Sequence, residues 1–164
     1  MNQTTDTLAA NIAASVQEFV SALPEDEKQV VTDSFAALQA SDVAASAVVA
    51  GDTAPDFTLP NATGRPVRLH EELQRGPVIL SFYRGGWCPF CNMHLTALRD
   101  AIPAISDMGI DVLFLSGDRS ELLLDSLSRE TQDAIDGLGY TILSDANAQA
   151  ATALGIAFKA SART

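Results

Sequence analysis

Along residues 1–40 of this chain, hydrophobic positions recur every three or four residues, which is the spacing of one face of an α-helix. The pattern predicts a helix over residues 7–22 and a second helix that begins at Pro24, because proline suits the first helical position and acidic residues follow it. Two short amphipathic helices cannot bury both of their apolar faces alone. We therefore interpret residues 1–45 as a helical extension that packs on the main domain or on another subunit.

After a weakly patterned linker, the chain changes to strands that alternate with helices. A segment bounded by prolines predicts only a short edge strand at 56–59, because proline cannot donate a hydrogen bond to a neighbouring strand. Further apolar runs predict three strands, the first of them buried on both faces: 78–83, 111–116 and 140–143. This alternation is typical of a mainly parallel sheet, so residues 46–164 are expected to form one α/β domain.

Individual residues predict where the helices of this domain begin, bend or end. Pro103 should kink or shorten the helix after the first of these strands, because proline lacks the N–H group of an interior helical position. Ser120 is expected to cap a helix that runs to about residue 135. Asp145 or Asn147 is expected to cap a short last helix, because their side-chain oxygens accept hydrogen bonds from free backbone N–H groups.

The charge of the chain excludes two classes of partner. The 164 residues include 10 lysines and arginines against 21 acidic residues, which gives a formal net charge of -11. So acidic a chain, without a basic stripe, repels nucleic acid and anionic membrane surfaces, and neither is expected as a partner. The first residues lack the positive charge and apolar run of a secretory signal, and no apolar stretch is long enough to span a bilayer. We therefore expect a cytoplasmic protein.

The only two cysteines, Cys88 and Cys91, lie three positions apart where the apolar run 78–83 gives way to a helical pattern. Backbone N–H groups in the first turn of a helix have no helical partner, and the helix dipole is positive there. Both effects favour the reactive thiolate and lower a cysteine pKa from about 8.5 to roughly 3.5–7.5. In a reducing compartment, such a pair is typical of catalysis or metal binding rather than of a structural disulfide.

Three interpretations of the cysteine pair are open. Redox catalysis needs one exposed, acidic sulfur and a second sulfur within bonding reach, and a two-residue spacer supplies both. A zinc site would take the two cysteines together with His94 and His70, whereas structural zinc sites usually have two paired ligand clusters. Two buried, inert thiols are the third interpretation. The strand–turn–helix context favours redox catalysis, with no metal.

Residues around the pair are candidates for a supporting role. Arg84 would stabilise a thiolate by its charge, with a solvated loop arginine as the alternative, and Trp87 would shield the sulfurs from water. Pro89 stiffens the turn between the cysteines and has no N–H group to leave unpaired. Arg119 is a weaker candidate, because it follows the second apolar run and α/β proteins gather functional side chains at the carboxyl ends of strands.

Three segments, in this order, resemble the peroxiredoxin family of AhpC/TSA type in the thioredoxin-fold superfamily. Residues 51–59 resemble its entry segment, and residues 82–91 resemble its active-site segment in the branch that carries a Cys-x-x-Cys pair. Residues 143–156 resemble a later segment with Leu-Ser-Asp and a glycine. The resemblance covers about two-thirds of the chain, from residue 51 onward, and implies a thioredoxin-like fold.

The resemblance also implies a thiol peroxidase that reduces hydrogen peroxide or organic hydroperoxides. It places the family's peroxide-attacking cysteine on Cys91 and makes Cys88 the resolving cysteine. It further implies a thioredoxin-type dithiol donor and no cofactor, and it leaves a homodimer open. The first alternative is a thioredoxin-like disulfide reductase, which would attack with Cys88. The second alternative is a non-catalytic interaction protein with incidental cysteines.

Members of the resembled family continue beyond the last matched segment with two further strands and a helix. Because this sequence ends at Thr164, we expect a thioredoxin-like fold that is incomplete at its C-terminus. Such a sheet would have an exposed edge and uncovered apolar helix faces. We therefore expect a version of the chain extended by these elements to be the more stable one.

Overall fold

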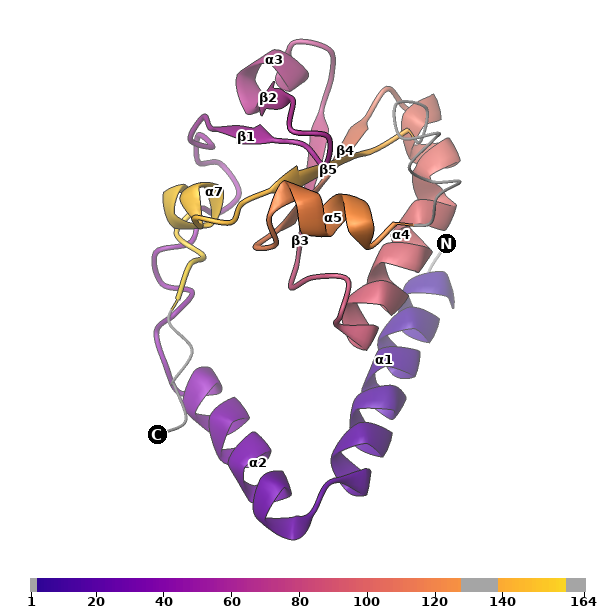
Figure 1. Ribbon diagram of the computed structural model, residues 1–164, viewed down its shortest axis with the longest axis vertical. Coiled ribbons are helices and arrows are strands. Elements are labelled where there is room, and N and C mark those ends of the chain that lie inside the picture. Colours follow the sequence, from indigo (N-terminus) through magenta and orange to yellow (C-terminus); the bar gives the residue numbers. More distant parts are fainter. Residues whose placement is uncertain (1–2, 128–138, 159–164) are drawn as a thin grey trace.

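The computed structural model describes residues 3–127 and 139–158 (Figure 1). The extension consists of α1 (Gln3–Ala22) and α2 (Glu25–Gln39), and Pro24 is the N-cap of α2 rather than its first residue. α1 lies alongside the later helix α4, whereas α2 turns away and has no buried residue. No helix in the described ranges combines the length and apolar character that a membrane crossing requires.

A small antiparallel hairpin follows the linker. β1 (Thr58–Pro60) pairs with β2 (Pro66–Arg68), and α3 (Leu69–Leu73) comes directly afterwards. The prolines of the two strands lie opposite each other at one end of the hairpin, where proline is tolerated. The Asn61 side-chain oxygen accepts hydrogen bonds from two backbone N–H groups of the turn. The short edge strand expected from the sequence is confirmed.

Within the described residues, three parallel strands form the central sheet in the order β3–β4–β5. These strands are β3 (Val78–Tyr83), β4 (Asp111–Ser116) and β5 (Thr141–Ser144). The helices that connect or follow them are α4 (Pro89–Asp107), α5 (Ser120–Asp125) and α7 (Gln149–Ala153). The predicted alternation of strands and helices and the predicted parallel sheet are confirmed.

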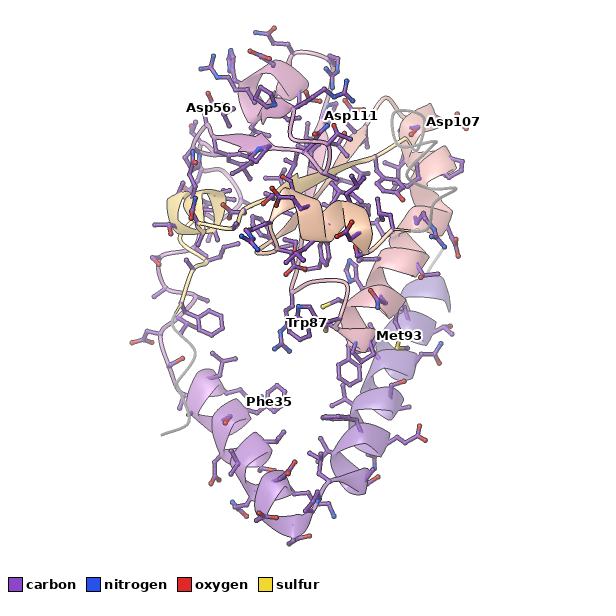
Figure 2. All side chains as sticks on the ribbon, viewed as in Figure 1. Phe35, Asp56, Trp87, Met93, Asp107 and Asp111 are labelled. Atoms are coloured by element: carbon purple, nitrogen blue, oxygen red, sulfur yellow. The ribbon has the colours of Figure 1, made fainter. Side chains whose placement is uncertain are left out.

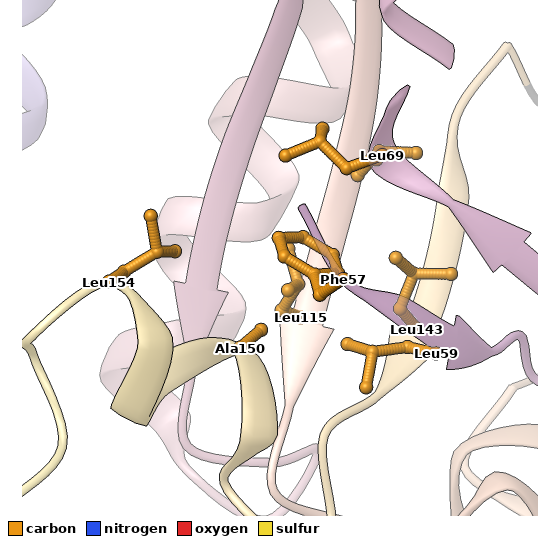
Figure 3. Close-up of a cluster of buried hydrophobic side chains, with 8 residues drawn as sticks. Phe57, Leu59, Leu69, Leu115, Leu143, Ala150 and Leu154 are labelled. Atoms are coloured by element: carbon orange, nitrogen blue, oxygen red, sulfur yellow. The ribbon is translucent and has the colours of Figure 1, made fainter. Parts of the chain in front are cut away.

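β4 is the central strand and alternates its side chains between two apolar cores. Leu113 and Leu115 belong to one core, whose other buried members are Phe57, Leu59, Leu69, Leu143, Ala150 and Leu154 (Figure 3). Val112 and Phe114 belong to the second core, together with buried residues of α4 and α5. Because both faces of β4 are covered, its sequence is a continuous apolar run rather than an alternating one.

β3 is less buried than β4: its two faces pack on the two cores, but mostly through partly buried side chains, so the expected burial on both faces is only partial. Of its residues only Ser81 is buried, and Phe82 is 38% exposed. Among the described strands β3 pairs with β4 alone, so its other edge has no neighbouring strand. An apolar run therefore marks both the central strand and the edge strand of this sheet.

Two expectations about helices, shortening at Pro103 and capping by Ser120, were wrong, whereas a kink at Pro103 stays a prediction. Pro103 lies inside α4 without shortening it, because the buried face of the helix, with Ile102 and Ile105, outweighs the lost hydrogen bond. Ser120 is the first residue of α5 and does not cap it; Arg119 holds the N-cap position, and its side chain makes no cap bond. α5 ends at Asp125, and the expected continuation toward residue 135 lies largely outside the described residues.

Ala148 holds the N-cap position of the last described helix, but of the two residues expected to cap it Asp145 does bond its free N–H groups. The carboxylate of Asp145 accepts hydrogen bonds from the backbone N–H groups of Ala150 and Ala151 in α7, at 3.0 and 2.9 Å. Nearby, the linker is bonded to the segment after α7, because the Ser46 hydroxyl donates to the Gly155 carbonyl at 3.0 Å. A division of the chain between residues 45 and 46 stays a prediction.

Candidate active site

The loop after β3 places the cysteine pair at the start of α4. Cys88 is the N-cap residue, with an extended backbone, and Pro89 is the first residue of the helix. The Cys91 backbone N–H donates to the Cys88 sulfur at 3.4 Å, so this sulfur accepts the bond that a side-chain oxygen usually accepts at a helix N-cap. One residue further on, the Asn92 amide donates to the Gly86 carbonyl at 2.9 Å and fastens the loop to the helix.

Both cysteines are free thiols. When the pair loses one proton, the negative charge is favoured on the sulfur of Cys88 rather than on that of Cys91. Cys88 is only 3% exposed, and this burial by itself would raise its pKa. Hydrogen bonds from the Cys91 thiol and from the backbone N–H groups of Cys91 and Phe90 act in the opposite direction. The positive charge of Arg84 adds to them, and together they lower the pKa of Cys88 below its ordinary value.

Cys91 is half-buried, and its pKa is raised. Burial, the hydrogen bond between the two thiols and the charge of Cys88 all disfavour the Cys91 thiolate. The backbone N–H of Arg84 and the charge of its guanidinium group favour the Cys91 thiolate, but they do not outweigh the other effects. The more acidic sulfur is therefore the buried one and the more accessible sulfur is the less acidic one, whereas the sequence argument placed both properties on a single sulfur.

Arg84 and Trp87 contact each other beside the pair. The Arg84 guanidinium lies over the Trp87 ring, 4.7 Å from its centroid, in a cation–π contact. Trp87 is 63% exposed and projects from the cysteine loop, as Figure 2 shows. A ring so exposed covers little of the sulfurs, and its contact with Arg84 instead restrains the positive charge that acts on both thiols.

Replacing Gly85 by alanine is expected to disrupt this contact. Gly85 has a φ of +148°, and an added Cβ would overlap Trp87 Nε1 and a carboxylate oxygen of Asp118. We expect the free energy of unfolding to fall by roughly 1–3 kcal/mol, and the emission of the only tryptophan to shift as its ring moves. Urea unfolding and fluorescence measure both effects.

The matched control for this variant is Gly117→Ala. A Cβ at Gly117 would meet no atom within 4 Å, and this glycine is not in the left-handed region. Its unfolding free energy and tryptophan emission should stay close to those of the parent. Equal emission spectra for the Gly85 and Gly117 variants would contradict the assigned contact.

Tyr83 and Asp118, which the sequence reasoning did not name, lie beside the cysteine loop. Tyr83 ends β3 and lies opposite Ser116 of β4 in the parallel register. The pKa of Tyr83 is raised to about 12, chiefly by burial and also by the charges of Asp118 and Cys91. A hydrogen bond from Ser116 acts in the opposite direction but does not outweigh them. The Tyr83 hydroxyl therefore stays protonated. Tyr83 and Asp118 lie at the carboxyl ends of neighbouring parallel strands, and this position was the sequence signal that could have identified them.

The remaining candidates are not joined to the cysteines. Arg119 is exposed in front of α5, His94 is exposed on α4, and His70 is exposed in α3. None of the hydrogen bonds or ion pairs of the described residues connects them with the pair. In the same part of the chain, no three His, Cys, Asp or Glu side chains come together as metal ligands would. The zinc interpretation therefore finds no support in the structure.

Comparison with known proteins adds to this geometry. The AhpC/TSA family profile matches residues 50–164, which include the whole cysteine loop. The chain belongs to the AhpC/TSA family. Peroxiredoxin Bcp of Escherichia coli (strain K12) is 35% identical over 107 residues, which are 65% of this chain and 64% of that protein. Peroxiredoxin Q, chloroplastic, of Sedum lineare is 38% identical over 74 residues, which are 45% of this chain and 39% of that protein.

Solved structures share the fold of this AhpC/TSA chain. Peroxidoxin BcpB from Mycobacterium tuberculosis superposes with a TM-score of 0.56 at 31% identity, over 64% of each chain. Plasmodium vivax 2-Cys peroxiredoxin superposes with a TM-score of 0.53 at 22% identity, over 66% of this chain and 70% of that one. The predicted thioredoxin-like α/β fold is confirmed. The chain spans 64% of the length of Bcp, and the extension precedes the family match.

Proposed function

We propose that this protein is a thiol peroxidase that reduces hydrogen peroxide or organic hydroperoxides with Cys88 and Cys91. The observation that carries the proposal is the hydrogen-bonded pair of free thiols at the start of α4, in a chain of the AhpC/TSA family. A helix N-terminus with Arg84 beside it supports an anionic sulfur there. Peroxiredoxin is the name that the relatives carry, which favours a peroxide as the oxidant.

In the proposed reaction, Cys91 attacks first because it is the more accessible sulfur. Its proton passes along the thiol–thiol hydrogen bond to Cys88, and the Cys91 thiolate then attacks one peroxide oxygen. The O–O bond breaks, the sulfur becomes a sulfenic acid, and the other oxygen leaves as water or an alcohol after protonation. Cys88 then attacks the Cys91 sulfur, which forms the disulfide and releases water. Its lowered pKa suits it to this second attack.

The cycle needs a reductant that returns the disulfide to two thiols. A thioredoxin-type dithiol protein fits, because it exchanges with a disulfide through a mixed-disulfide intermediate and needs no cofactor from this chain. We propose that the protein works in the cytoplasm, where such donors keep thiols reduced. A homodimer is a further proposal.

One observation favours a second candidate function, a thioredoxin-like disulfide reductase. The acidic sulfur is that of Cys88, the first cysteine of the pair, and this is the cysteine that such a reductase would use to attack a protein disulfide. In that reaction Cys91 would resolve the mixed disulfide. Rapid, thioredoxin-dependent consumption of peroxide with negligible reduction of insulin would support the peroxidase. Insulin reduction by dithiothreitol, accelerated by the protein and without peroxide turnover, would overturn it.

Replacing Cys88 by alanine is expected to lower the pKa of Cys91. The variant removes the sulfur that bonds the Cys91 proton and the like charge that disfavours its thiolate, and both raise the pKa of Cys91 in the parent. The pH profile of Cys91 alkylation by iodoacetamide should therefore shift to lower pH. The reciprocal variant Cys91→Ala should shift the profile of Cys88 to higher pH, because it removes a hydrogen-bond donor. An unchanged Cys91 profile would contradict the shared-proton arrangement.

A further inference from the structure

The extension, which precedes the family match, contacts the segment between the two cysteines. The rings of Phe19 in α1 and Phe90 in α4 meet edge to face, with centroids 5.9 Å apart and an interplanar angle of 80°. This is a favourable aromatic geometry. It occurs where α1 lies alongside α4, close to the cysteine loop (Figure 1). α1 of the extension is therefore in contact with the segment between the two cysteines.

Phe90 has a direct connection with the reactive sulfur. Between the cysteines stand only Pro89, whose ring fixes its own backbone, and Phe90. The backbone N–H of Cys91 donates to the Cys88 sulfur at 3.4 Å, and the N–H of Phe90 also acts to lower the pKa of Cys88. A contact that holds the Phe90 ring also restrains the peptide units that carry these two donors. Orientation of the donors toward Cys88 is thus coupled to the position of the Phe90 side chain.

We propose that Phe19 is a positioning residue for the cysteine pair, acting through its ring contact with Phe90 to hold the first turn of α4 in the geometry that stabilises an anionic sulfur. The proposal gives the extension a role in the site itself. Asn92 fastens the start of α4 to the loop through its bond to Gly86. Phe19 supplies the corresponding restraint from α1.

The other exposed aromatic side chain of the extension serves as a comparison. Phe35 lies on α2 and is 56% exposed, close to the 50% of Phe19. Figure 2 shows Phe35 on the inner side of α2, across from the cysteine loop rather than against it. Within the described residues, the aromatic contact that reaches the motif is that of Phe19. Phe35→Ala therefore matches Phe19→Ala in chemistry and exposure, but not in contact.

The test is a thiolate titration of the full chain, followed by ultraviolet absorbance against pH. Phe19→Ala should move the first thiolate transition to higher pH and decrease the thiolate fraction at neutral pH about two- to fivefold, as expected for loss of one aromatic pair. Phe19→Leu keeps the apolar bulk and should give a smaller shift in the same direction. Phe35→Ala should leave the transition where it is in the parent. Circular dichroism establishes whether each variant is folded. If Phe19→Ala does not fold, Phe19→Leu is used for the test in its place.

A double-mutant cycle decides whether Phe19 acts through Phe90. In a Phe90→Ala background, Phe19→Ala should cause no further shift of the transition. The proposal is overturned if the Phe19 variants titrate like the parent, if Phe35→Ala shifts the transition equally, or if the Phe19 effect persists without Phe90. The inference rests on the proposed function only in taking this pair as the reactive centre. The titration needs no peroxide, so its failure is distinguishable from a failure of the peroxidase assay.

Discussion

Cys91→Ala is expected to abolish catalytic peroxide consumption, lowering the turnover rate by about a thousandfold or more, as removal of an enzyme nucleophile does. Cys91 is the accessible sulfur of the pair, and without it the remaining thiol is buried. Cys88→Ala should instead react with one equivalent of peroxide and then stop, because its sulfenic acid has no partner within the chain. A coupled assay with a thioredoxin system measures the turnover of each variant.

Mass spectrometry after one equivalent of peroxide locates the sulfenic acid in the two single-cysteine variants. The proposed roles require that the added oxygen, trapped with a sulfenic-acid reagent, is found on Cys91 in Cys88→Ala. Rapid formation of a sulfenic acid on Cys88 in Cys91→Ala would reverse the two roles. Full activity of both variants would leave the cysteines incidental and favour a non-catalytic interaction protein. The parent chain, treated in parallel, should lose two hydrogens as its disulfide forms.

Asp145→Ala is expected to cause the largest loss of stability among the substitutions considered, about 2–4 kcal/mol in the free energy of unfolding. The Asp145 side chain is only 5% exposed and accepts hydrogen bonds from the backbone N–H groups of Ala150 and Ala151. Without the carboxylate, both donors at the start of α7 lose their partner, and one of them belongs to a fully buried residue. Urea denaturation followed by circular dichroism measures the difference from the parent.

Asp52→Ala is the control for this prediction. Asp52 is also an aspartate that accepts a backbone hydrogen bond, from the Val49 N–H at 2.9 Å, but it is exposed. Water can replace its carboxylate, so the expected loss is below about 1 kcal/mol. Asp145→Asn retains one oxygen acceptor and should lie between the two alanine variants. Equal losses for Asp52→Ala and Asp145→Ala would show that burial of the cap does not matter.

The difference between the two sulfurs bears on how the pair would work. A thiolate is a better nucleophile than a thiol, but the thiolate here is favoured on the sulfur that solvent reaches least. In the proposed mechanism the hydrogen bond between the two thiols would remove the conflict, because a proton that moves along it would transfer the charge to the accessible Cys91. The buried Cys88 would then be next to the oxidised sulfur, in position to form the disulfide.

Much of the fold was predictable because it depends on neighbours in the sequence. Helical periodicity identified α1 and α2, and the apolar run 111–116 identified β4 as a strand. The spacing of Cys88 and Cys91 was enough to place both at a strand-to-helix turn, since a helix N-terminus needs only a few consecutive residues. Asp145 was recognisable as a cap for the same reason.

Only the tertiary structure decided what depends on residues far apart in the chain. The apolar runs of β3 and β4 look alike, but among the described strands pairing makes one an edge strand and the other central. Pro103 stays inside α4 because distant side chains bury that helix. The burial and the charge of Arg84 that act on both sulfurs depend on the folded neighbours, and the contact of Phe19 with Phe90 depends on how α1 packs. Sequence spacing determines local hydrogen bonds, whereas desolvation, charge and packing are set by the neighbours that the folded chain brings together.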